Sequence, residues 1–166
     1  EGDTTEVFGS LINGVVHTIE INSARSTAAV RRFEGNSRIR VHRGSSPKVL
    51  RRLTVPERVL FYLDAHWNEY WPLLDELATI AERGLTRPVI VIHDVFVPDR
   101  PDLGFDQYDG QRLDLEYVRP ELATIYGPQG YETTYNDVAE GGTPRRSVRN
   151  PEFRDVTPPR CFLTTP

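Results

Sequence analysis

The sequence has no methionine and a single cysteine, Cys161, among its 166 residues. One cysteine excludes an internal disulfide framework and a four-thiolate zinc site. No apolar run approaches the roughly 18 residues that span a bilayer, and no signal segment opens the chain, so we expect a cytoplasmic protein with no membrane partner. The net charge of −4 gives a nucleic-acid partner no electrostatic support. Because even an initiator methionine is lacking, we expect residue 1 not to be the translation start.

The residues that are present suit one α/β domain over residues 1–166, in which short β-branched runs alternate with helical patterns. Residues 15–19 predict a strand that ends at Glu20, and the Ala- and Arg-rich residues 23–33 predict a helix. In residues 38–42 apolar and charged side chains alternate, as in a half-exposed strand near an edge. A short helix over 47–53 follows.

The middle of the sequence predicts a strand–helix–strand unit. The continuous apolar run 59–63 is typical of a strand buried on both faces, and it ends at Asp64. Residues 72–83 carry apolar side chains at helical spacing, and Gly84 ends this helix. A second apolar strand over 89–92 ends at the pair His93-Asp94.

The last third of the sequence is less regular. Residues 95–112 are dense in Asp, Pro and Gly and predict a long loop that would serve as a lid. A helix is expected over 113–126, with a kink or a fresh start at Pro120. Residues 131–135 and 161–164 would pair as a closing antiparallel hairpin, with a flexible loop over 140–159 between them.

Polar side chains follow the two strands of the middle unit at the point where each strand ends. Because the carboxyl ends of neighbouring parallel strands meet at one edge of a sheet, we expect Asp64, His93 and Asp94 to lie close together. Two carboxylates and one imidazole suit magnesium or manganese, and iron or zinc less well. His66 follows Asp64 by two residues and would serve as a general base. The alternative is structural, with the aspartates capping helices and His93 bonding a loop carbonyl.

Three other features have both a structural and a functional interpretation. Glu20 ends a strand where an acidic residue can accept hydrogen bonds from ribose hydroxyls, although a solvated glutamate is the simpler interpretation. Gly44, Ser45 and Ser46 form either an ordinary turn or a place where the backbone approaches a flat ligand. Trp67 and Trp71 flank the predicted site, and core packing is the default role of both.

Four segments together resemble a class I S-adenosylmethionine-dependent methyltransferase. They are Val-His-Thr-Ile-Glu-Ile at 16–21, Gly-Ser-Ser-Pro at 44–47, Phe-Tyr-Leu-Asp-Ala-His-Trp at 61–67 and Val-Ile-His-Asp at 91–94. More narrowly, they are similar to the metal-dependent O-methyltransferases of sugars and natural products. The resemblance implies a Rossmann-like, mostly parallel sheet with helices on both faces and a C-terminal antiparallel hairpin. It also implies that the family's central first strand is missing ahead of residue 1.

The resemblance assigns roles to particular residues. Glu20 would hold the cofactor ribose, Gly44, Ser45 and Ser46 would lie near the adenine, and Asp64 would line the cofactor pocket as well as bind the metal. Gly2, Thr4 and Thr5 would belong to the end of the Gly-rich loop that touches the methionine part of the cofactor. Asp64, His93 and Asp94 match the magnesium ligands, which are usually all acidic in the family, so His93 is a departure. His66 matches the position of the base.

The function implied is methyl transfer from S-adenosylmethionine to a hydroxyl of a small molecule, assisted by a divalent metal. Two alternatives remain open at this point. A metal-dependent hydrolase could use the same Asp and His residues to activate water, and a methyltransferase-like binding module could lack catalysis altogether. The sequence also leaves open which molecule accepts the methyl group and whether the chain forms a homo-oligomer.

Overall fold

The computed structural model describes all residues except 1, 67–69, 87, 101, 137–159 and 165–166. The protein is of the mixed α/β kind, with parallel and antiparallel strand pairs. The chain divides into two compact units, Glu1–Leu53 and Thr54–Pro166, and each unit is described by itself. The single domain expected over residues 1–166 stays a prediction. Among the described residues, no helix is both long and apolar enough to cross a bilayer.

The first unit contains a pair of parallel strands, β1 (Val16–Glu20) and β2 (Ile39–Arg43), with helices around them. These helices are α1 (Asp3–Leu11), α2 (Ser23–Arg32) and α3 (Ser46–Leu50). The side chain of Asn22 caps α2 by accepting hydrogen bonds from two backbone N–H groups of its first turn. Ala29 and Phe33 pack with Ile39 into a small core. The sequence did not predict α1, because its residues were assigned to a loop.

The second unit contains a sheet of four strands in the order β3-β4-β8-β7, and all three neighbouring pairs are parallel. The strands are β3 (Leu60–Leu63), β4 (Val89–Ile92), β7 (Glu132–Asn136) and β8 (Arg160–Thr164). The predicted antiparallel hairpin at the C-terminus is therefore wrong. Parallel strands need a connection of about a dozen residues or more, and residues 137–159 are long enough to provide one.

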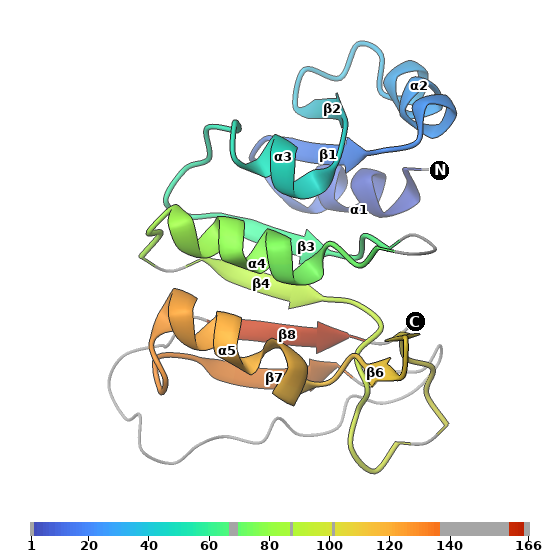
Figure 1. Cartoon of the computed structure of the whole chain (residues 1–166). Coiled ribbons are helices and arrows are strands. Elements are labelled where there is room, and N and C mark those ends of the chain that lie inside the picture. Colours follow the sequence, from blue (N-terminus) through green and yellow to red (C-terminus); the bar gives the residue numbers. More distant parts are fainter. Residues whose placement is uncertain (1, 67–69, 87, 101, 137–159, 165–166) are drawn as a thin grey trace. The chain divides into compact units, whose positions relative to one another are not determined.

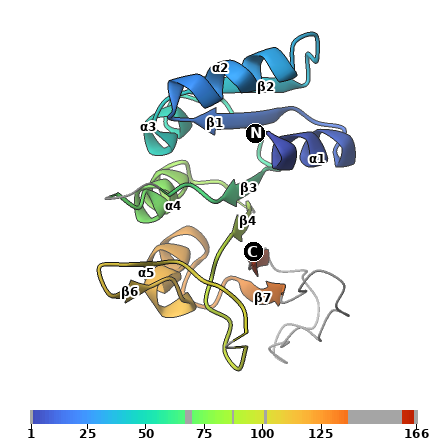
Figure 2. The ribbon, with the colours of Figure 1, turned by 90° about the vertical axis from the view of Figure 1, so that its right-hand side faces the viewer.

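Two helices, α4 (Leu73–Glu82) and α5 (Leu115–Tyr126), cover the same face of this sheet (Figures 1 and 2). Leu77 and Ile80 of α4 and Val118 and Leu122 of α5 are almost fully buried. On β3 and β4 alternate residues are buried, and Leu60 is 47% exposed. The prediction that residues 59–63 are buried on both faces is thus wrong for Leu60, because both described helices of this unit lie on one side.

The chain between β4 and α5 is more ordered than a plain loop. It contains a short antiparallel pair, β5 (Gln107–Tyr108) and β6 (Gln111–Arg112), inside the predicted lid loop 95–112. The α5 helix runs through Pro120 as one helix, and the side chain of Asp114 caps its start. The predicted flexible loop 140–159 and Trp67 lie outside the described residues.

Candidate metal centre

The ends of β3 and β4 bring polar side chains together at one edge of the second unit's sheet. These strands pair in parallel with Leu63 beside Ile92, so Asp64 and His93 follow at the same level. One donor atom each from Asp64, His66 and Asp94 lies within 4.8 Å of the other two. A point equidistant from three atoms that lie 4.8 Å from one another is about 2.8 Å from each of them. Metal–oxygen distances in proteins are shorter, about 2.0–2.6 Å. The three donor atoms would therefore have to move closer together to hold one divalent cation.

His93 is held between two carboxylates. Its Nδ1 lies 2.8 Å from Asp94 Oδ1 and 3.4 Å from Asp64 Oδ1. Interaction with Asp64 first, and then with Asp94, raises the pKa of His93 to about 10, although partial burial opposes the shift. The alignment is poor, since neither Nδ1 nor Asp94 Oδ1 has a hydrogen-bond partner of good geometry within the described chain. The attraction is mainly between charges, and Asp94 Oδ1 stays available to a cation.

The geometry separates the roles of the two histidines. The donor group contains His66 but not His93, whereas the sequence analysis assigned His93 to the metal and His66 to proton transfer. An imidazole must be neutral to bind a metal, and the raised pKa of His93 favours its protonated form. Asp64 and Asp94 are therefore the best supported ligands, and the metal-ligating role of His93 stays a prediction.

The backbone of Asp94 has an unusual conformation. Its φ of 56° lies in the left-handed region, which a non-glycine residue adopts at a cost of about 1 kcal/mol. Aspartate and asparagine tolerate this region better than most residues. Such conformations concentrate at functional sites, where the surrounding structure imposes them. The conformation follows directly after β4 and fixes the side chain of Asp94 beside His93.

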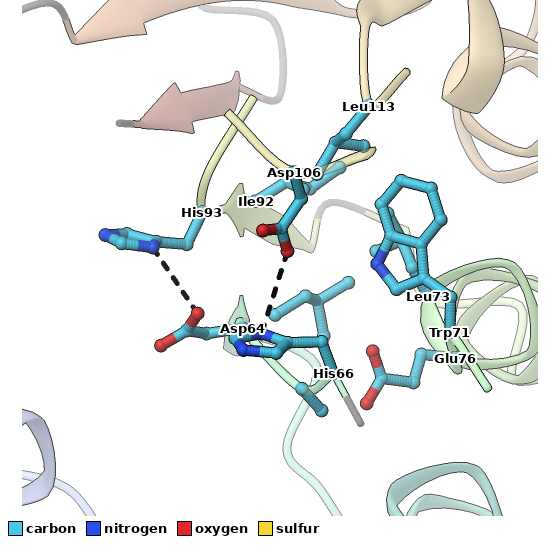
Figure 3. A pocket seen from close by; sticks show the side chains of 11 residues that line it. Asp64, His66, Trp71, Leu73, Glu76, Ile92, His93, Asp106 and Leu113 are labelled. Carbon is cyan, nitrogen blue, oxygen red and sulfur yellow. Dashed lines mark ion pairs between the residues drawn. The ribbon is translucent and has the colours of Figure 1, made fainter. Parts of the chain in front are cut away.

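A third carboxylate, Asp106, completes the site and was missed by the sequence analysis. Its Oδ2 lies 3.7 Å from Nδ1 of His66 (Figure 3). Burial is the largest cause of a raised pKa for Asp106, and the nearby Asp94 and Asp64 act in the same direction, while His66 opposes it. Asp106 is one of several acidic residues in a loop without regular spacing, so no periodic signal distinguishes it in the sequence.

Two of the donors, Asp64 and His66, line a small pocket with a volume of about 10 Å³, room for about one water or one bare ion. Charged and apolar side chains line it together, among them Asp64, His66, Asp106, Trp71 and Leu113 (Figure 3). Trp71 packs on Tyr117 and Tyr108, with ring centroids 4.9 and 5.1 Å away. The indole is thus a packed wall of the pocket, which agrees with its default role in packing.

In the first unit, the residues expected near the cofactor share one edge. The backbone N–H of Gly44 donates to the carbonyl of Glu20 over 3.0 Å, which places the two strand ends side by side. The Glu20 carboxylate accepts one bond, from the N–H of Asn22, and has further acceptor capacity. Ser45 precedes α3, and the buried hydroxyl of Ser46 has no hydrogen-bond partner among the described atoms. An unsatisfied buried hydroxyl beside an acidic strand end fits a polar ligand.

The N-terminal residues are placed differently from a Gly-rich loop. Gly2 precedes α1 with a φ of 86°, and a Cβ there would lie 2.9 Å from the Phe33 ring. Thr4 is exposed in the first turn of α1. Thr5 is buried and its hydroxyl donates to that of Thr18, in the middle of β1, over 3.0 Å. The Thr5 hydroxyl therefore already has a structural partner, and cofactor contacts of Gly2, Thr4 and Thr5 stay predictions.

Comparison of the chain with protein-family models, with curated proteins and with solved structures gave no match. Functional inference therefore depends on the site itself. Two carboxylates, Asp64 and Asp94, lie beside the imidazole of His93, whose pKa is raised, and a third, Asp106, lies beside His66. The oxygen-rich donors suit magnesium or manganese.

Proposed function

We propose that the protein is a Rossmann-like, S-adenosylmethionine-dependent methyltransferase that uses a divalent metal, magnesium by preference, to methylate a hydroxyl of a small molecule. The observation that carries the proposal is the convergence of donor atoms from Asp64, His66 and Asp94 within 4.8 Å at adjacent strand ends. Open α/β sheets bind ligands at this edge. The resemblance of the strand-end segments to the methyltransferase family supplies the reaction.

The first unit supports a nucleoside-containing cofactor. Glu20 ends β1, and its carboxylate can accept further hydrogen bonds, as ribose recognition requires. Gly44 has a φ of 147°, and a Cβ there would approach Val49 to 3.1 Å, so the turn beside Glu20 favours glycine. The hydroxyl of Ser46, two residues after Gly44, has no hydrogen-bond partner among the described atoms. Together these residues fit the ribose and adenine contacts that the resemblance implies.

In the proposed reaction, residues of the second unit would have separate roles in metal binding and proton transfer. A bound magnesium ion would lower the pKa of a coordinated acceptor hydroxyl. Asp64 and Asp94 would hold this ion, and His66 would remove the proton from the attacking oxygen. Tyr62 is unsuited to that task, because burial, and then Asp64 and Asp94, raise its pKa to about 12. The carbonyl of Asp94 anchors the loop that carries Asp106, which would help to exclude water.

Calorimetric titration with S-adenosylmethionine, with and without magnesium, tests the proposal. We expect the cofactor to bind, and Glu20→Gln to weaken binding about tenfold or more, because a neutral amide accepts more weakly from ribose hydroxyls than a carboxylate does. Glu34→Gln, an exposed glutamate of the same unit, is the matched control and should bind as the original chain does. Metal binding without any cofactor binding would contradict the proposal.

One observation favours a second function, metal-dependent hydrolysis. The donor group includes one imidazole, that of His66, and nitrogen donors suit zinc or iron better than magnesium. This function would require zinc or two metals and would not depend on Glu20. A preference for zinc over magnesium, together with no effect of Glu20→Gln on any measured property, would favour it. A chain that binds cofactor but has no transferase activity on any hydroxyl compound would instead indicate a binding module.

A further inference from the structure

Asp106 is held over the candidate metal centre by its own backbone. Its N–H donates to the carbonyl of Asp94 over 2.9 Å, and its carbonyl accepts from the N–H of Leu113 over 2.9 Å. The carbonyl of Leu113 in turn accepts from the N–H of Phe96 over 2.7 Å. These hydrogen bonds join distant parts of the loop after β4 to one another beside the candidate site. The position of the Asp106 side chain is therefore set by the fold.

The carboxylate of Asp106 faces the imidazole of His66. Oδ2 of Asp106 lies 3.7 Å from Nδ1 of His66, and the side chains are 26% and 48% exposed (Figure 3). The distance is longer than a hydrogen bond. Hydrogen bonds of catalytic groups are often long before substrate binds and tighten in the complex. A small rotation of the exposed imidazole is enough to form this one.

The other carboxylates near His66 have different partners. Asp64 and Asp94 both contact Nδ1 of His93. Within the loop, Asp102 pairs with Arg100, and Asp109 is exposed and does not line the pocket. Glu76 lines the same pocket, but among the described residues the ion-pair distance to His66 is recorded for Asp106.

We propose that Asp106 is the positioning residue of His66: its carboxylate accepts a hydrogen bond from Nδ1–H and so leaves Nε2 unprotonated. A histidine in a reactive site has two distinct nitrogens, and the partner of one decides which carries the proton. Only the use of this pairing rests on the proposed function, because in methyl transfer Nε2 of His66 would take the proton of the acceptor hydroxyl. The pairing itself needs no cofactor, metal or acceptor.

The tautomer of His66 can be read directly from the ring nitrogen shifts of ¹⁵N-histidine-labelled protein. The spectrum is recorded at a pH above which the His66 signals no longer change, and His66→Gln assigns them. We expect the Nδ1–H form of His66 to dominate in the original chain. Asp106→Ala and the nearly isosteric Asp106→Asn should both lower its population, because each removes the negative charge that attracts Nδ1–H. Asp109→Asn, in the same loop, should leave it unchanged.

Three results would overturn the inference. They are a dominant Nε2–H form in the original chain, no change in either Asp106 variant, or a loss of metal affinity in Asp106→Asn with an unchanged tautomer, which would make Asp106 a metal ligand instead. The outcome is separate from that of the proposed function. A tautomer change without S-adenosylmethionine binding would keep the positioning role and reject methyl transfer, and the reverse combination would reject only the role of Asp106.

Discussion

The sharpest test of the candidate metal centre is the effect of a substitution of Asp94 on cation affinity. Asp94→Asn removes one negative charge from the donor group but keeps the size of the side chain, and asparagine tolerates the left-handed φ of 56°. Two unit charges 4 Å apart in bulk water interact by about 1 kcal/mol, so a divalent cation loses about 2 kcal/mol or more. That loss raises the dissociation constant about 30-fold. The effect should be at least as large as that of Asp64→Asn, because the Asp94 side chain is 16% exposed and that of Asp64 39%.

Manganese is the practical probe, since free Mn²⁺ gives an electron paramagnetic resonance signal that weakens on binding. Titrations of the original chain, Asp94→Asn and Asp109→Asn would be compared at one salt concentration. Asp109 is an exposed acid that also has a positive φ, so its substitution controls for both charge and backbone. Equal affinity in Asp94→Asn and the original chain would refute the assignment of Asp94. No binding of millimolar Mn²⁺ by the original chain would refute the metal centre as a whole.

Three further predictions concern stability. Leu77→Ala, at a fully buried position, should lower the free energy of unfolding by about 2–5 kcal/mol in urea titrations, and a loss below about 1 kcal/mol would contradict its place in the core. Gly44→Ala should lower the melting temperature because of its φ of 147°, whereas Gly14→Ala, with only ordinary contacts, should not. His17 and His42 bond each other over 2.9 Å, and burial lowers the pKa of both, so the unfolded state binds more protons. Stability should therefore fall as the pH drops below about 6.5, and replacing both by Phe should reduce that loss in thermal melts.

The strands and helices that frame the site were predictable because their signals are local. Apolar runs gave β3 and β4 within a residue, and helical spacing gave α4 and α5. The direction of β8 was not predictable in the same way. Apolar strands look alike in parallel and antiparallel pairs, and the direction depends on the connection through residues 137–159. Helix α1 was missed because its polar first turn resembles the end of a loop.

The sequence located the candidate site but could not distribute the roles within it. Parallel pairing of β3 and β4 is sufficient to bring Asp64 and Asp94 together, and that much follows from strand ends alone. His93 directly follows β4 and His66 lies three residues after β3, so the sequence places both histidines near a strand end. What separates them is side-chain direction: Nδ1 of His93 faces Asp64 and Asp94, and Nδ1 of His66 faces Asp106. Side-chain direction depends on contacts with other segments, which no local pattern records.

Electrostatic interactions link the positions of these acidic and histidine side chains. A raised pKa favours the protonated form of His93, and this cation compensates part of the negative charge of the carboxylates beside it. Without that compensation, carboxylates so close together would repel one another. Asp106 adds the third carboxylate from a loop that hydrogen bonds to Asp94. In the proposed function, the same loop would therefore supply both a carboxylate near the candidate cation site and the positioning residue of His66.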